Sequence, residues 1–222
     1  MSGVYAALYI LCLSAVCMAD TATFTYKELN RGVLSTADFS VVRTQEGYHI
    51  SICSTEGKKR IRQDMVCDST FATLQWRYQS DQNTEISFRR NADRIELVGT
   101  LRGKPVIKNL TIDSRPWYQV VPLGLQTVSR DSAGKSKFWA VSLEQPAVLK
   151  AVCFHVAGTA NAALPGHPEI PCRCFHMKIE GLLTQIWKGD YFIRQDDHTF
   201  MYYQGYSFGS KKPTGTIEAV AH

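Results

Sequence analysis

Residues 151–179 read AVCFHVAGTANAALPGHPEIPCRCFHMKI, and this stretch carries the clearest fold signal in the chain. Its first and last eight residues alternate apolar and polar side chains, which is the period of a β-strand with one buried face. We expect these two arms to pair as an antiparallel hairpin around a loop at 159–171, with Phe154 and Phe175 on one side of the sheet. The other side would then gather the thiols and imidazoles of Cys153, His155, Cys172, Cys174 and His176.

Strand-like segments continue on both sides of this stretch at short, regular spacing, which is typical of an antiparallel meander. The candidate strands are 21–29, 39–43, 48–53, 59–66, 71–78, 86–88, 95–101, 106–112, 137–143, 186–194 and 200–206. Residues 117–128 (WYQVVPLGLQTV) interrupt the pattern, and Pro122 and Gly124 favour a short helix or a tight loop there. The sequence therefore predicts a mostly β domain at 20–210, folded as a single curved antiparallel sheet or an incomplete barrel with one short insertion.

The two ends of the chain differ from this domain. Residues 1–19 hold no charged side chain, and their apolar run is short for a membrane span but suits a signal peptide. We expect cleavage near Ala19 and a periplasmic or secreted protein, with an uncleaved anchor as the alternative. Residues 211–222 predict a flexible tail, apart from a strand-like segment at 216–220.

Composition and motifs narrow the function classes. The 222 residues are 45% hydrophobic and 20% charged, which fits a folded domain. The net charge of +5 is mild, and the basic residues are scattered along the chain. The chain has no glycine-rich phosphate loop and no nucleic-acid-binding motif, so we expect no nucleic-acid partner. Gly205–Gly209 matches the G-x-S-x-G pattern of hydrolases, but Lys211-Lys212-Pro213 follows where such an enzyme needs a helix. We therefore expect neither enzymatic activity nor a cofactor.

The cysteines allow two interpretations. In an oxidising compartment, the five that follow residue 19 predict two disulfides and one spare thiol. Cys53 with Cys67 is a plausible pair, and Cys153 with Cys172 or Cys174 would bridge the hairpin. Cysteine and histidine are also zinc or copper ligands, so the alternative to disulfides is a metal site formed by the five Cys and His residues of the 151–179 hairpin. Its C-x-H and C-x-C-x-H spacings lack the C-x-x-C of structural zinc sites, which favours the disulfides.

The aromatic residues point to a ligand face. A curved sheet that does not close leaves a concave apolar face, which a helix, a partner or a lipid-like ligand must cover. The alternation at 71–78 places Leu74 and Trp76 on one face. The candidate ligand-binding residues are Leu74, Trp76, Ile86, Phe88 and Trp139, with Trp117 as a lid. A filled core would use the same residues.

These features together resemble a known group of proteins. An export signal precedes a meander with one apolar insertion, and the long hairpin ends in Met177-Lys178-Ile179-Glu180-Gly181, before Ile186-Trp187, Tyr191-Phe192 and Arg194. This arrangement resembles the periplasmic LolA-like half-barrel group and the exported DUF3108-like proteins over residues 21–206. The resemblance implies an incomplete barrel whose apolar interior receives lipid or acyl chains, and it implies no catalytic residues.

We therefore expect an exported, non-enzymatic protein that binds a lipid, an acyl chain or a lipidated partner on the apolar face of a curved sheet. One alternative is a metal-binding or thiol redox module on the Cys/His face of the 151–179 hairpin. The other is a structural component of an envelope complex. The expected partner is a hydrophobic small molecule or lipid, or an envelope protein.

Overall fold

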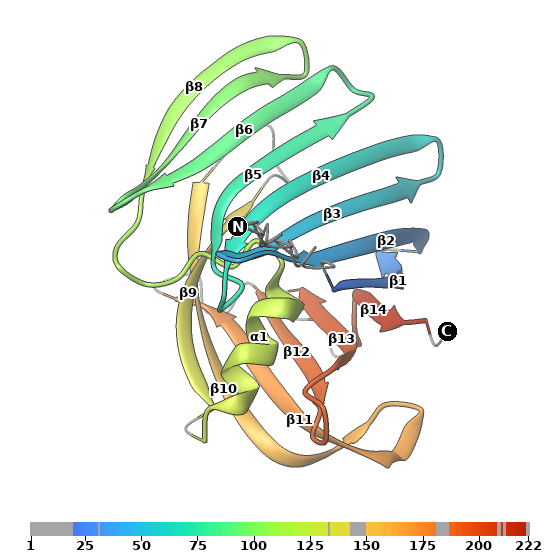
Figure 1. Cartoon of the computed structure of the whole chain (residues 1–222). Coiled ribbons are helices and arrows are strands. Elements are labelled where there is room, and N and C mark those ends of the chain that lie inside the picture. The colour runs from blue at the N-terminus through green and yellow to red at the C-terminus, as the bar shows by residue number, and fades with distance from the viewer. Residues whose placement is uncertain are drawn as a thin grey trace, which may run out of the picture.

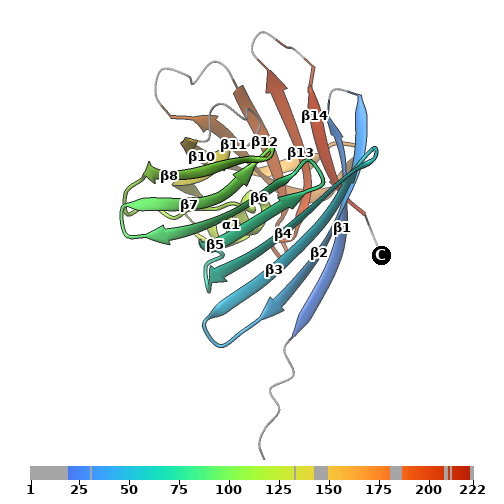
Figure 2. The same cartoon turned by 90° about the horizontal axis from the view of Figure 1, so that it is seen from above.

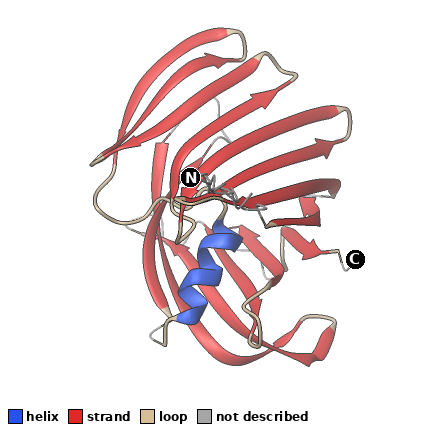
Figure 3. Cartoon of the chain, in the orientation of Figure 1, coloured by secondary structure: helices blue, strands red, loops and turns tan. Residues whose placement is uncertain are grey.

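In the computed structural model, which describes residues 20–30, 32–132, 134–142, 150–180, 187–207, 210 and 212–220, fourteen strands form one sheet (Figures 1 and 3). The strands are β1 (Thr21–Asn30), β2 (Val33–Arg43), β3 (Gly47–Glu56), β4 (Lys59–Asp68), β5 (Thr73–Ser80), β6 (Thr84–Asn91), β7 (Arg94–Leu101), β8 (Lys104–Thr111), β9 (Lys135–Ser142), β10 (Lys150–Leu164), β11 (His167–Ile179), β12 (Trp187–Arg194), β13 (Phe200–Ser207) and β14 (Gly215–Ala219). The prediction of a mostly β chain with one curved antiparallel sheet is confirmed.

The order of the strands in the sheet is β8-β7-β6-β5-β4-β3-β2-β1-β14-β13-β12-β11-β10-β9. The sheet therefore consists of a first meander, β1–β8, and a second meander, β9–β14, which are joined where Tyr26 of β1 lies opposite Ala219 of β14. Residues 215–219 occupy the middle of the sheet, which confirms the strand-like segment that the sequence predicts at 216–220 within the C-terminal tail. The predicted signal peptide, 1–19, lies outside the described residues.

The helix α1 (Val121–Arg130) connects the two meanders and lies inside the curve of the sheet (Figures 1 and 2). Pro122 stands in its first turn, where a missing N–H breaks no helical hydrogen bond. Gly124 faces the ring of Tyr118, and a Cβ added there would lie 2.5 Å from a ring carbon. The helix reaches this close to the ring because residue 124 has no side chain.

Inward-facing side chains form two large clusters, and α1 contributes to both. The cluster lying mainly on the first meander includes Ile50, Met65, Trp76, Ile86, Phe88, Ile95, Leu97 and Leu123. The cluster lying mainly on the second meander includes Leu125, Phe138, Val156, Phe175, Met177, Ile193 and Phe200. A third, small cluster consists of Leu164, Cys172, Cys174 and Phe192, on the opposite face of the second meander. We call it the outer cluster.

The two edge strands, β8 and β9, do not pair, so the barrel is incomplete. β8 instead approaches β10, and the segment between β8 and α1 carries the polar contacts of this seam. Trp139 Nε1 donates a hydrogen bond to Asp113 Oδ1 (2.9 Å), and Arg115 Nη1 lies 2.6 Å from Glu180 Oε2. Hydrogen bonds from Arg115 and Trp139 hold the pKa of the Asp113 carboxyl well below its usual range.

The central hairpin is longer than the sequence predicts. β10 and β11 continue to a tight turn at Pro165-Gly166, so the prediction of a loop at 159–171 is wrong. Proline followed by glycine with φ +82° fits the two central positions of a type II turn, which joins two strands directly. Phe154 consequently lies opposite Ile179, and Phe175 lies opposite Gly158. Both phenylalanines still lie on one side of the sheet, as predicted, and they belong to or pack against the inward-facing cluster of the second meander.

Candidate functional site

The predicted ligand-binding residues on the concave face pack against one another as a core. The ring of Trp76 stacks on Phe88 with centroids 4.4 Å apart, and Trp117 meets Trp76 edge-on at 6.5 Å. Trp76 Nε1 donates to Gln63 Oε1 (3.1 Å), and Ile86 is fully buried beside these rings. Trp117 is also fully buried, so it is a core residue and not an exposed lid.

Leu74 and Trp139 are not buried in the way that these four residues are. Cys67 pairs with Thr73 and Val66 pairs with Gln75, which leaves Leu74 as the extra residue of a β-bulge. The bulge breaks the alternation, so Leu74 is 40% exposed and the prediction that it shares the inward face of Trp76 is wrong. Trp139 is half-buried at the seam, with the guanidinium of Arg115 5.0 Å from its ring centroid.

The predicted disulfide between Cys53 and Cys67 is wrong. Cys53 lies opposite Arg62 of β4, five residues from Cys67, which corresponds to about 16 Å along a strand. Disulfides need Cα atoms within about 7 Å of each other. The two side chains also point to opposite faces, since Cys53 is exposed and Cys67 is buried. Both are free thiols.

The predicted disulfide across the hairpin fails for the same reason. Cys174 lies opposite Thr159, six residues from Cys153, or about 20 Å along the strand. Cys172 lies opposite Ala162, still farther away. Because the turn is tight, the register separates Cys153 from Cys172, Cys174 and His176, the three residues on β11 that were predicted to join it as metal ligands. The side chains of Cys153 and His155 lie outside the described part of the structure.

Cys174 and His176 do come together, and Asp190 joins them. Cys174 and His176 flank the inward-facing Phe175 on β11, so both point to the outer face of the sheet, and Asp190 of β12 lies directly opposite His176. His176 Nδ1 is 4.0 Å from Cys174 Sγ and 2.8 Å from Asp190 Oδ1. Gln204 of β13 donates from Nε2 to the other carboxylate oxygen of Asp190 (3.2 Å). Burial raises the pKa of the Cys174 thiol to about 12.

Sequence reasoning missed Asp190. The residue stands in the predicted strand 186–194, and an acidic side chain between Gly189 and Tyr191 in an aromatic strand is a weak signal. Its contact with His176 depends on the register between β11 and β12, which the sequence does not state.

A groove lies where the tip of the β10–β11 hairpin meets β1, β13 and β14. It has a volume of about 370 Å³. We call it the hairpin groove, and its lining residues are Lys27, Leu164, Pro165, His167, Ile170, Met201, Tyr202, Glu218, Ala219 and Val220. Most of this lining is apolar, and Leu164, Ile170, Met201 and Tyr202 also belong to or pack on the outer cluster. None of the ligand-binding residues predicted from the sequence lines it.

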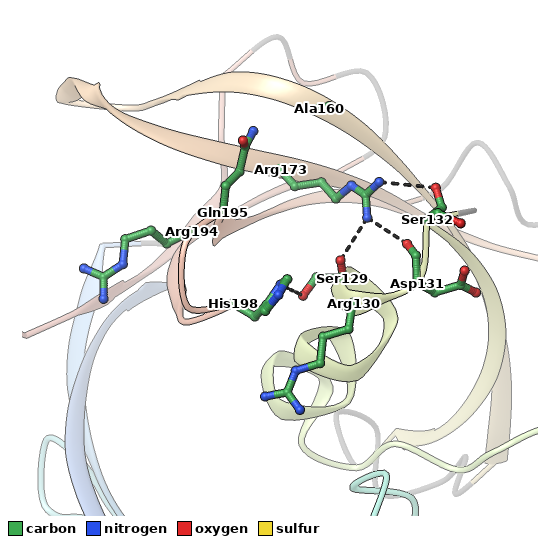
Figure 4. A pocket seen from close by; sticks show the side chains of 9 residues that line it. All are labelled: Ser129, Arg130, Asp131, Ser132, Ala160, Arg173, Arg194, Gln195 and His198. Atoms are coloured by element: carbon green, nitrogen blue, oxygen red, sulfur yellow. Dashed lines mark hydrogen bonds between the residues drawn. The ribbon is translucent and has the colours of Figure 1, made fainter.

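A second pocket, of about 310 Å³, lies at the C-terminal end of α1 (Figure 4). Arg173 donates to the carbonyl oxygens of Ser129 (3.0 Å), Asp131 (2.9 Å) and Ser132 (3.4 Å), which neutralises the negative end of the helix. His198 Nδ1 lies 2.8 Å from Ser129 Oγ. The pocket residues Arg130 and Arg194 extend away from Arg173 (Figure 4), and Arg194 pairs with Asp196 at 3.0 Å. These contacts close the helix end, and we assign no ligand here.

The open, curved sheet around the helix α1 defines a β-barrel-like protein. No family model and no curated protein matches the sequence. Among solved structures, the chain is similar to a β-barrel-like protein of the domain of unknown function DUF1849 from Brucella abortus, with a TM-score of 0.52. The match covers 90% of this chain and 94% of that chain at 7% identity. Likeness at this identity supports the β-barrel-like fold, and it does not point to the LolA-like or DUF3108-like groups. Among the described residues, no helix has the length and hydropathy needed to cross a bilayer.

Proposed function

We propose that this is an exported, non-enzymatic binding protein that holds one small hydrophobic molecule, such as a single acyl chain, in the hairpin groove. The observation that carries the proposal is the groove's volume of about 370 Å³ together with its mainly apolar lining. Small-molecule sites usually measure about 300–1,000 Å³, with apolar walls and a few polar groups. A volume near the lower limit favours one chain over a lipid with several.

The walls and the rim of the groove suit the two ends of such a ligand. Leu164, Ile170 and Met201 offer aliphatic and thioether surface to a hydrocarbon chain. Lys27 and Glu218 stand opposite each other on β1 and β14 at the groove, and both are exposed. A ligand carboxylate would gain from the ammonium of Lys27, whereas a neutral or cationic head group would turn toward Glu218.

The groove is a better candidate than the concave interior predicted from the sequence. The interior candidates Trp76, Ile86, Phe88 and Trp117 are 0–2% exposed, so a ligand there would have to displace them. The groove needs no such rearrangement, because its half-buried side chains Ile170, Met201 and Tyr202 already border open volume.

A chain-length series tests the proposal. Each CH₂ group that leaves water contributes about 0.8 kcal/mol, so affinity for saturated fatty acids should rise about fourfold per carbon until the groove is full. The measurement is displacement of a fluorescent fatty acid from protein purified without detergent, alongside native mass spectrometry for a co-purified adduct.

Two matched variants locate the site. Ile170→Trp places a large ring in the groove and should weaken fatty-acid binding at least tenfold, with the fold checked by circular dichroism. Val98→Trp adds the same ring on the outer face of β7, where Val98 is 56% exposed, and should leave binding unchanged. Equal binding by wild type and Ile170→Trp, or affinity that does not depend on chain length, would refute the proposal.

A further inference from the structure

We infer that Cys174, His176 and Asp190 form a binding site for a transition-metal dication, with zinc as the best fit, on the outer face of the second meander. The inference does not depend on a ligand in the hairpin groove. It rests on three different donor atoms, namely a sulfur, an imidazole nitrogen and a carboxylate oxygen, that lie within 4.8 Å of one another.

The sheet itself brings the three donors together. Residues two apart on a strand share a face, so Cys174 and His176 project side by side from β11. Antiparallel pairing then sets Asp190 directly beside His176. The positions of all three therefore depend on regular strand geometry and not on a loop, which is the arrangement that holds a site most precisely.

The distances are close to those of a coordinated ion. Zinc binds sulfur at about 2.3 Å, and imidazole nitrogen and carboxylate oxygen at about 2.0–2.2 Å, so tetrahedral ligands stand about 3.3–3.7 Å apart. Cys174 Sγ and His176 Nδ1 are 4.0 Å apart, and His176 Nδ1 and Asp190 Oδ1 are 2.8 Å apart. Small rotations of the side chains, which close the first gap and widen the second, would admit the ion.

The donor set selects a class of metal. Thiolate and imidazole are soft or borderline ligands that suit zinc and copper, whereas magnesium and calcium take oxygen ligands. A thiolate and a carboxylate together also balance the charge of a dication. The hydrogen bond from Gln204 Nε2 to the second oxygen of Asp190 (3.2 Å) orients the carboxylate, as outer partners of metal ligands commonly do.

The same surface supplies the remaining features of a three-ligand site. The side chain of His176 is 51% exposed, which gives an ion access from solvent and leaves a coordination position for water. Lys188 is a nearby cation on β12, but its ammonium lies 4.8 Å from the centre of the Tyr206 ring and so has a partner of its own.

Cobalt provides the most direct test, because thiolate ligation gives Co²⁺ a charge-transfer band in the near ultraviolet. The protein, kept reduced with a phosphine and carrying Cys53→Ser to remove the thiol that is exposed among the described cysteines, is titrated with Co²⁺ and then with competing Zn²⁺. We expect one ion per chain, a thiolate band and displacement of cobalt by zinc. Cobalt binding without a thiolate band would overturn the inference.

Variants assign the ligands. Cys174→Ser should abolish the thiolate band, and His176→Gln and Asp190→Asn should each weaken binding about tenfold or more. The matched control is His167→Gln, because His167 also stands on β11 and meets a carboxylate, Glu169, at 3.3 Å, but has no thiol in its group. That control should bind as wild type does.

Because Cys174 is buried and its variant could misfold, His176→Gln and Asp190→Asn decide the question: wild-type affinity in both would overturn the site. Ile170→Trp, which fills the hairpin groove, should leave cobalt binding unchanged.

Discussion

Strands β6 and β12 bury their side chains in different ways. In β6 the side chains simply alternate: Thr84, Ile86 and Phe88 are buried, and the residues between them are exposed. β12 instead buries Tyr191, Phe192 and Ile193 in succession, so both of its faces are covered. The first meander thus presents its outer face to water. The second meander buries part of its own outer face under the tip of the long β10–β11 hairpin.

This difference explains where open sites remain. In the first meander, the inner face is filled by aromatic stacking, and the outer face is open to solvent and carries both charged pairs such as Arg77–Glu85 and apolar side chains such as Val98. In the second meander, the hairpin tip covers the outer cluster incompletely, which leaves the hairpin groove at its border. The three candidate metal ligands, Cys174, His176 and Asp190, also lie on the outer face of the second meander.

The largest effect is expected where β5 separates core from solvent. Trp76→Ala removes a ring that is 2% exposed and stacked on Phe88, so it should lower the free energy of unfolding by about 3–5 kcal/mol. Leu74→Ala, two residues away but turned outward by the bulge, should change it by less than about 1 kcal/mol. Urea denaturation followed by circular dichroism measures both. Similar losses in the two variants would mean that β5 continues its alternation without the bulge.

A smaller effect should distinguish the outer faces of the two meanders. Phe192→Ala removes a ring that is 6% exposed in the outer cluster, and we expect a loss of about 2–3 kcal/mol, because a small cluster can partly collapse around the gap. Val98→Ala, on the open outer face of β7, should cost about 0.5 kcal/mol or less. The same denaturation experiment applies. A negligible loss for Phe192→Ala would show that the hairpin tip does not pack on the sheet in solution.

The sequence predicted the strands well because a half-buried strand leaves a period of two in its side chains. It also placed the one insertion, since Pro122 at a helix start and the apolar residues after it are local signals. The bulge at Leu74 was missed because nothing in the local pattern distinguishes an extra residue from a continuing alternation.

The site was harder to predict than the fold, because it depends on register. Pro165-Gly166 was read as part of a long loop, although the pair is itself a turn signal. Because the turn was predicted in the wrong place, Cys153 was expected beside Cys174. Both predicted disulfides also assumed that cysteines on neighbouring strands lie opposite each other, which the register does not allow. Asp190 reaches His176 only across a strand pair, and the hairpin groove forms only when the hairpin tip folds over distant strands.

The smallest effect concerns the two cysteines that lie on opposite faces of the first meander. Burial raises the pKa of the inward-facing Cys67 thiol to about 11, from a model-compound value of 9.0. Well below pH 9, as at pH 7.5, the thiol is protonated in both the folded and the unfolded chain, so it has little effect on the pH dependence of stability there. Above pH 9 the unfolded chain releases the proton first, so the free energy of unfolding falls as the pH rises toward 11. At pH 10 this loss should reach about 1 kcal/mol.

Urea midpoints from pH 7.5 to 10.5 should therefore fall less steeply for Cys67→Ala than for wild type, whereas Cys53→Ala, which changes an exposed thiol, should keep the wild-type slope. Equal slopes for Cys67→Ala and wild type would mean that water reaches Cys67, and that the inner face near β4 is more open than the packing of Met65 and Trp76 implies.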